Sequence, residues 1–203
     1  MDLKTSNNKR ELLTAIRMGK LEIMNPISFI IDEICDCLLM DKYVAATTAT
    51  NLLLEETLKL ALIIDDSKGK TLDNGVVFEH MYQEEVDQNI DKKLSVNIDK
   101  ASKKGLIDDK EKEELHYMRQ QFRNPFSHGS HNEAIKGAKM LIATANINDV
   151  SNIKYKKVPV TNQPLLYYLA KHEFLKREAI GYFLKVYHYI VSFDKKLQQL
   201  YKI

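Results

Sequence analysis

Three side chains suited to catalysis lie close together in the stretch QFRNPFSHGSHNE, which spans residues 121–133. The chain holds few arginines, yet Arg119 and Arg123 both come shortly before His128. Arginine stays charged at physiological pH and grips phosphate with two hydrogen bonds. Histidine titrates near neutral pH and serves as an acid or a base, and an amide both donates and accepts. Arg123, Asn124 and His128 are therefore candidate catalytic residues.

Two predicted helices position these residues. Asp108 and Glu111 form a D-x-x-E capping box that opens a helix whose apolar stripe is Leu115, Met118 and Phe122. Because the residue before a proline is biased away from helical dihedrals, we expect this helix to end at Asn124. A second capping box, S-x-x-E, predicts a further helix over SHNEAIKGAKMLIATA, residues 130–145. His128 would then lie in a short turn between two helices.

The rest of the chain also has helical spacing. We expect helices at 25–40, at 43–65 as the most buried one, and between 76 and 104 with a break near 95. A short amphipathic helix precedes them, and a long helix follows from 164 onward, after a polar segment that holds one extended piece near 156–160. The predicted fold is an all-α, antiparallel up-and-down helical bundle with a long C-terminal helix. We predict one domain, 1–203, with a core of about 25–145, while 146–203 form a loop and a helical extension.

Composition narrows the classes of function. Charged residues make up 29% of the chain and nearly cancel, to a formal +2, which disfavours a generic polyanion binder but allows a local basic groove. Cys35 and Cys37 are one residue apart and would point in different directions on a helix, so we interpret them as buried thiols. The start of the chain lacks a signal-peptide core and no apolar run reaches membrane-spanning length. We expect a cytoplasmic protein without membrane contact.

The segment FRNPFSHG, residues 122–129, resembles the R-N-x-x-x-H signature of the HEPN superfamily. This resemblance implies a small helical bundle with the motif near the end of one long helix. It also implies a metal-independent endoribonuclease, without a cofactor, that forms a homodimer with a composite active site. Arg123 and His128 would be catalytic, and Asn124 would orient them. The implied setting is a toxin or phage-defence system, with an antitoxin or defence partner protein.

The implied reaction fits the chemistry of these residues. Attack by the RNA 2′-hydroxyl gives a 2′,3′-cyclic phosphate and needs one proton removed and another delivered, which two histidines of a dimer would do. Arg123 would stabilise the charge on the pentavalent phosphate. Two positions depart from the family pattern. Pro125 is a rigid element within the motif, and Ser130 stands where some HEPN toxins carry a tyrosine that their antitoxin modifies.

Further residues are candidates for contact with RNA. Basic, hydroxyl and imidazole side chains near the motif and in the later KYKK segment could bind the RNA backbone; they are Arg119, Ser127, His131, Lys154, Lys156 and Lys157. Arg119 could instead be a solvated partner of Glu114 or Glu133. We also expect that Glu55 or Glu56, in the most buried helix, reaches Arg123 and holds its guanidinium.

Two other interpretations remain open. Arg123 could simply cap a helix C-terminus, with Asn124 and Ser127 as ordinary turn residues and His128 bonded to a carbonyl. Alternatively, the chain could be a non-catalytic HEPN-fold module that binds RNA, a nucleotide or a protein. His128 and His131 have the spacing H-x-x-H, but only Glu133 is near enough in sequence to complete a metal site, so we predict no metal.

Overall fold

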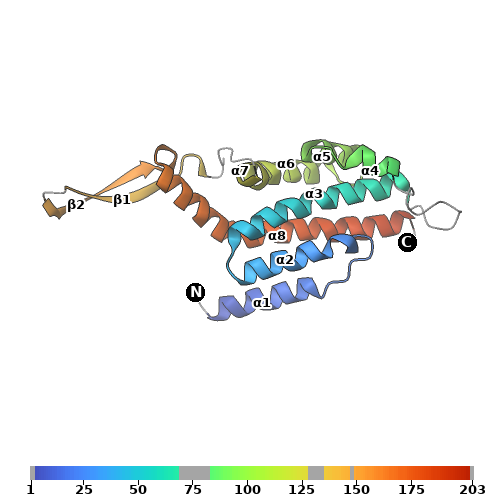
Figure 1. Ribbon diagram of the computed structural model, residues 1–203, viewed down its shortest axis with the longest axis horizontal. Helices are drawn as coiled ribbons and strands as arrows, with labels where there is room; N and C mark the ends of the chain where they lie inside the picture. Colours follow the sequence, from blue (N-terminus) through green and yellow to red (C-terminus); the bar gives the residue numbers. More distant parts are fainter. Residues whose placement is uncertain (1–2, 69–82, 128–134, 147–148, 202–203) are drawn as a thin grey trace.

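The computed structural model describes residues 3–68, 83–127, 135–146 and 149–201 (Figure 1). The described chain is mostly helical with one two-stranded sheet, as predicted for an all-α bundle. Its elements, in order, are α1 (Leu3–Arg17), η1 (Asn25–Ile27), α2 (Ser28–Leu39), α3 (Tyr43–Ser67), α4 (Gln83–Asn89), α5 (Leu94–Lys103), α6 (Asp109–Met118), η3 (Arg119–Arg123), α7 (Asn124–Ser127), β1 (Lys139–Asn146), β2 (Asp149–Pro159), η5 (Val160–Asn162) and α8 (Pro164–Tyr201).

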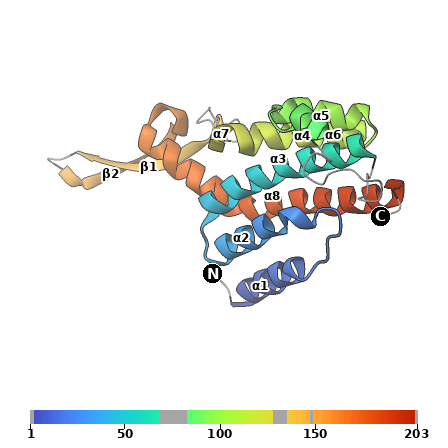
Figure 2. The same ribbon diagram turned by 45° about the vertical axis from the view of Figure 1, so that its right-hand side comes forward.

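Helices α1, α2 and α3 alternate in direction, whereas α8 runs parallel to α3 (Figure 1). Two hydrogen bonds join α3 to α8 in parallel, one from the Tyr182 hydroxyl to Asn51 and one from the Tyr201 hydroxyl to Asp65. In both ribbon views α3 and α8 lie side by side, with α2 and α1 on one side and α4 to α6 on the other (Figures 1 and 2). None of the helices within the described ranges is long and apolar enough to cross a membrane.

The hydrophobic core lies around α3, as expected for the most buried helix. Leu53, Leu54 and Leu58 of α3 are fully buried, and Phe183 and Ile190 of α8 are fully buried with them. The core therefore extends past residue 145 and includes α8, which the sequence analysis had placed in an extension. Burial of each such large apolar side chain stabilises the fold by about 1.5–3 kcal/mol.

Local signals in the sequence explain how α5 and α6 end and begin. Gly105 has φ +71°, a left-handed conformation that follows the end of α5 at Lys103. The Asp108 side chain accepts from the Glu111 amide, and the Glu111 side chain accepts from the Asp108 amide, so the predicted capping box is confirmed. Cys35 is a buried free thiol and Cys37 a half-buried one.

The helix predicted over residues 130–145 is wrong in its second half, because residues 139–146 form a strand. Strand β1 pairs antiparallel with β2, and the Val160 amide donates to the Ala138 carbonyl at the base of this hairpin. Gly137 has φ +81°, which breaks a helix, and Ile142 and Thr144 are β-branched residues that favour strands. The hairpin projects from the bundle beside the first part of α8 (Figure 1). Ser130 and Glu133, the predicted cap, lie outside the described residues.

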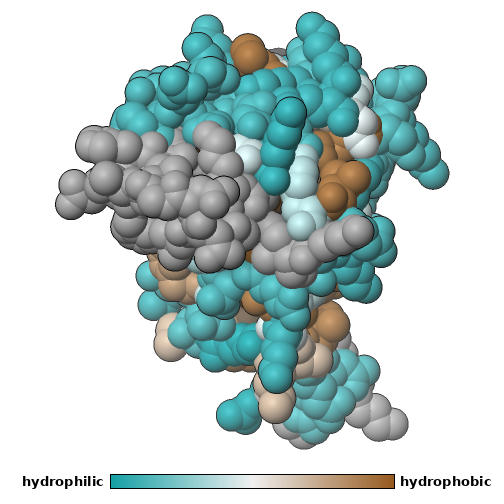
Figure 3. Space-filling view, turned by 90° about the vertical axis from the view of Figure 1, so that its right-hand side faces the viewer, coloured by the Kyte–Doolittle hydropathy of each residue, from teal (hydrophilic) through white to brown (hydrophobic). Residues whose placement is uncertain are grey.

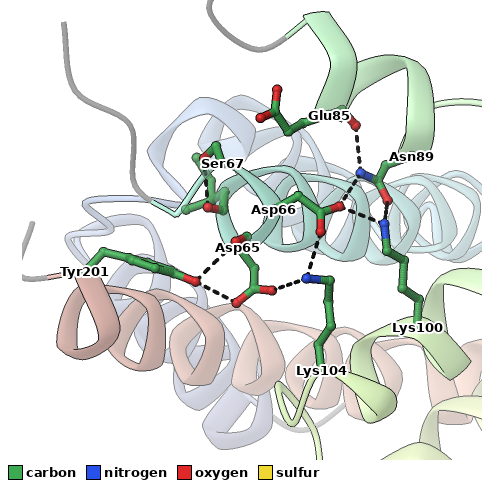
Figure 4. Close-up of polar contacts among 9 residues, drawn as sticks. Asp65, Asp66, Ser67, Glu85, Asn89, Lys100, Lys104 and Tyr201 are labelled. Atoms are coloured by element: carbon green, nitrogen blue, oxygen red, sulfur yellow. Dashed lines mark hydrogen bonds and ion pairs between the residues drawn. The ribbon is translucent and has the colours of Figure 1, made fainter. Parts of the chain in front are cut away.

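A network of charged side chains closes the opposite end of the bundle (Figure 4). Asp66 of α3 accepts hydrogen bonds from Lys100 at 2.7 Å and from Asn89 at 3.0 Å, and it forms an ion pair with Lys104 at 2.7 Å. Burial alone would raise the pKa of the Asp66 carboxyl, but the hydrogen bonds from Lys100, Lys104 and Asn89 outweigh it and lower the pKa to about 2. Asp66 thus ties α3 to α4 and α5.

Asp65 extends this network to the end of α8. Its carboxylate accepts from Lys104 at 2.6 Å and from the Tyr201 hydroxyl at 2.8 Å. The surface at this end of the molecule is mostly hydrophilic, with small hydrophobic patches (Figure 3). The two aspartates therefore hold four helices together where the surface is polar.

We predict that Asp66→Asn lowers the free energy of unfolding by about 2 kcal/mol at pH 7. The pKa of Asp66 is about 2 in the fold against an ordinary value of 3.8, so its contribution is present above that value and is lost as the pH falls toward 2. Urea unfolding of both proteins between pH 7 and pH 3 should show the difference shrinking below about pH 4.

The matched control is Asp87→Asn, at an exposed carboxylate whose hydrogen bond comes from Gln83 of the same helix. It should change the free energy of unfolding by less than about 0.5 kcal/mol. An Asp66→Asn effect that is equally large at pH 3 and pH 7 would contradict the assignment.

Candidate active site

The helix that carries Arg123 does not end at Asn124, which corrects the prediction from Pro125. Asn124 has φ −64° and ψ −47°, and its amide donates to the Arg119 carbonyl across a π-helical turn, after which α7 continues to Ser127. Proline cannot donate an amide hydrogen bond and clashes with the carbonyl four residues earlier. The wider turn before Pro125 accommodates both effects, since proline is tolerated in the first turn of a new helical segment.

An ion pair between Glu55 and Arg123 joins this turn to the central helix. The Arg123 Nε donates to the Glu55 Oε1 at 2.6 Å, and the two side chains are 21% and 24% exposed. The expectation that one of the two α3 glutamates reaches Arg123 is therefore confirmed. Its neighbour Glu56 forms an ion pair with Lys59 of the same helix instead, at 2.9 Å. Because Arg123 and Glu55 are both partly exposed, the pair lies at the edge of the core, where an anionic ligand can approach.

Aromatic side chains pack next to the ion pair. Phe122 stacks on Tyr182 with ring centroids 4.0 Å apart and planes 2° from parallel. The buried Tyr182 hydroxyl donates to Asn51 Oδ1 at 2.8 Å, one helical turn from Glu55 on α3. Burial, and then the negative charge of Glu55, raise the pKa of Tyr182 well above its usual range. The phenol therefore remains a protonated donor and fixes α8 against α3 beneath Arg123.

Arg119 begins the π-helical turn that Arg123 ends, and it is half-buried. Its Nε is buried and has no hydrogen-bond partner among the described residues. Glu114, which the sequence left open as its partner, accepts hydrogen bonds from Lys185 at 2.6 Å and from Tyr189 at 2.9 Å instead. These two donors lower the pKa of Glu114. Glu133, the other partner that the sequence left open, lies outside the described residues. Contact of Arg119 with RNA therefore stays a prediction.

Lys171 of α8 is a residue at this site that the sequence analysis missed. Its Nζ donates to the Pro125 carbonyl at 2.8 Å and lies 4.5 Å from the centroid of the Phe126 ring. Burial lowers the pKa of Lys171. Lys171 therefore holds α7 in place through its backbone and one aromatic ring. No local pattern signals this contact, because the two residues are 46 positions apart in the chain.

The structure brings only part of the predicted site together. Arg119, Arg123 and Asn124 share one continuous helical segment, and Ser127 is the last residue of α7. His128 and His131 lie outside the described residues.

The lysines of the KYKK segment are on β2, in the hairpin that projects away from the bundle (Figure 1). They are exposed, but the strand pairing puts Lys157 beside Tyr155 on one face and puts Lys154 and Lys156 on the other. They therefore do not form one patch with Arg123.

Comparisons with known proteins give no relative for this arrangement. The chain matches no protein-family model, and neither a curated protein nor a solved structure is detectably similar to it. Within the described ranges, no three His, Cys, Asp or Glu side chains converge in a way that could hold a metal ion.

We predict that Glu55→Gln lowers the free energy of unfolding by about 1–3 kcal/mol, because it removes the carboxylate that compensates the half-buried Arg123. Glu56→Gln is the matched control, since its ion pair with Lys59 lies within one helix and the Glu56 side chain is 36% exposed. The control should change stability by less than about 0.5 kcal/mol. Urea unfolding at pH 7 measures both, and equal effects of the two substitutions would contradict a special role for Glu55.

Proposed function

We propose that this chain is a metal-independent endoribonuclease of the HEPN type that acts in a toxin or phage-defence setting. The observation that carries the proposal is the Glu55–Arg123 ion pair, which fixes a partly exposed guanidinium five residues before His128. The order Arg123, Asn124 and His128 matches the R-N-x-x-x-H signature. The helical bundle, with this motif at the end of its α6–α7 segment, is the setting that the resemblance implies.

The proposed reaction uses the RNA's own 2′-hydroxyl as nucleophile. His128 of one copy removes its proton while the 2′-oxygen bonds to the adjacent phosphorus and the bond from phosphorus to the 5′-oxygen breaks. A second histidine protonates the departing 5′-oxygen, so the products carry a 2′,3′-cyclic phosphate and a 5′-hydroxyl. Arg123 neutralises the charge that builds up on the pentavalent phosphorus, and Asn124 orients either the imidazole or a phosphate oxygen.

The need for a separate acid and base supports a homodimer, in which each copy supplies one motif. The molecular surface near α7 suits such an interface. Val44, Phe126, Tyr168 and His172 line a shallow hollow of about 240 Å³ beside Lys171. Tyr168 is 68% exposed and Val44 55% exposed, so apolar area is available there. A second copy that covers this hollow would bring the two α7 helices near each other. The lysines of β2 would then contact the RNA backbone outside the cleft.

We predict that the purified wild-type chain cleaves single-stranded RNA in EDTA and leaves cyclic phosphate ends. Arg123→Ala and His128→Ala should each slow cleavage at least about 100-fold, because they remove charge stabilisation and acid–base catalysis respectively. His188→Ala is the matched control, since His188 is an exposed histidine of α8 outside the motif. Analysis of product ends by gel mobility before and after phosphatase treatment measures the chemistry.

Each result separates the proposal from an alternative. A folded wild-type chain that binds RNA without cutting it is a non-catalytic binding module. Cleavage that survives His128→Ala comes from another site or a contaminant, and cleavage that requires a divalent cation contradicts the proposed mechanism.

A further inference from the structure

A concave site lies on the other flank of the helical segment that carries Arg123. It is a groove of about 420 Å³ between the end of α6, η3 and α8, and Tyr117, Gln121 and Phe122 line it from the first side. Phe122 faces this groove, whereas the next residue, Arg123, faces Glu55 of α3. The groove is within the size range of small-molecule sites in proteins.

One face of α8 forms the opposite wall. Arg177, Gly181 and Lys185 are spaced i, i+4 and i+8, so they lie above one another on the same helix face. A Cβ atom added at Gly181 would meet no atom within 4 Å, so the glycine leaves open space between two cations. Glycine within a helix is less stable than alanine.

The floor of the groove is aromatic. The Phe122 and Phe174 rings have centroids 5.5 Å apart, and the Arg177 guanidinium lies 6.0 Å from the centroid of Phe174. The Arg177 side chain is 73% exposed, so it can swing aside or cover a ring inserted beneath it. Tyr117, which is 56% exposed, stands at the outer edge. A planar ring is the shape that stacks between an aromatic floor and a guanidinium.

The rim of the groove carries charged side chains of both signs. The lining residues include two cations, Arg177 and Lys185, and one carboxylate, Glu178. Arg177 is paired with Glu178 at 2.6 Å and Lys185 with Glu114 at 2.6 Å. Exposed ion pairs of this kind are weak, so a phosphate can compete for either cation. An aromatic floor with cations above it suits a planar base that carries a phosphate.

We infer that this groove binds one nucleotide of a single-stranded RNA, with the base on Phe122 and Phe174 and the phosphate at Arg177 and Lys185. The inference rests on the proposed ribonuclease function and adds a substrate-binding subsite to it. The groove and Arg123 lie on opposite sides of one helix, so only the width of that helix, about 10 Å, separates them. An RNA strand that crosses the end of this helix occupies both the groove and the site at Arg123. The groove then selects the nucleotide near the cleaved bond.

A substitution at Gly181 can fill the groove without changing the Glu55–Arg123 ion pair. Gly181→Trp places an indole over the aromatic floor, and Gly181→Ala leaves the groove open while improving helix propensity. The probe is a fluorescein-labelled, 2′-O-methylated RNA decamer, which has no 2′-hydroxyl and cannot be cleaved by the proposed reaction. Fluorescence anisotropy at 50 mM salt should give a dissociation constant at least about tenfold higher for Gly181→Trp than for wild type. Gly181→Ala should bind within about twofold of wild type.

Folding of each variant is checked by circular dichroism and thermal unfolding. Equal affinity of wild type and Gly181→Trp, or no binding of the decamer by wild type, overturns the inference. Because the probe resists cleavage, the two proposals fail separately. If the decamer binds in a way that depends on Gly181 but the chain cuts no RNA, the nucleotide-binding groove is supported and the ribonuclease function is rejected. If Gly181→Trp leaves RNA cleavage unchanged, only the nucleotide-binding groove is rejected.

Discussion

The contact between Glu55 and Arg123 is the interaction on which the proposed site depends. It links the most buried helix of the bundle to a π-helical turn, and it sets the position of a cation at the edge of the core. Both side chains are largely shielded from water, so removal of one charge leaves the other less well compensated. The stacked Phe122–Tyr182 pair and the Tyr182–Asn51 hydrogen bond keep α3, α8 and η3 at the separation that this ion pair needs.

Several parts of this arrangement were predictable because they depend on local chemistry. The capping box at Asp108 and Glu111 satisfies the first amides of a helix with side chains that are three residues apart, and a sequence displays that spacing directly. The burial of α3 follows from a sequence that is apolar over much of the helix circumference. The reach of an α3 glutamate to Arg123 was predictable as one of two options, since a carboxylate in an apolar helix needs a cation.

Other parts depend on contacts between distant residues. A hairpin forms where a helix was predicted because Ile142 and Thr144 pair with residues of β2. The sequence of residues 139–146 alone does not reveal this pairing. Asn124 stays helical because the preceding π-helical turn makes room for Pro125. The preference of a residue before proline for non-helical dihedrals takes no account of such a turn. Lys171 and Gly181 belong to α8, and only the packing of α8 against η3 and α7 shows their relation to the motif.

In the proposed mechanism, Glu55 holds Arg123 in the position from which it stabilises the cleaved phosphate. A double-mutant cycle on the rate of RNA cleavage in EDTA tests it, using Glu55→Gln, Arg123→Lys and the two together. If the pair acts as one unit, the double variant should be no slower than Arg123→Lys alone, within about twofold. Losses that multiply, or a Glu55→Gln variant as fast as wild type, would contradict the claim.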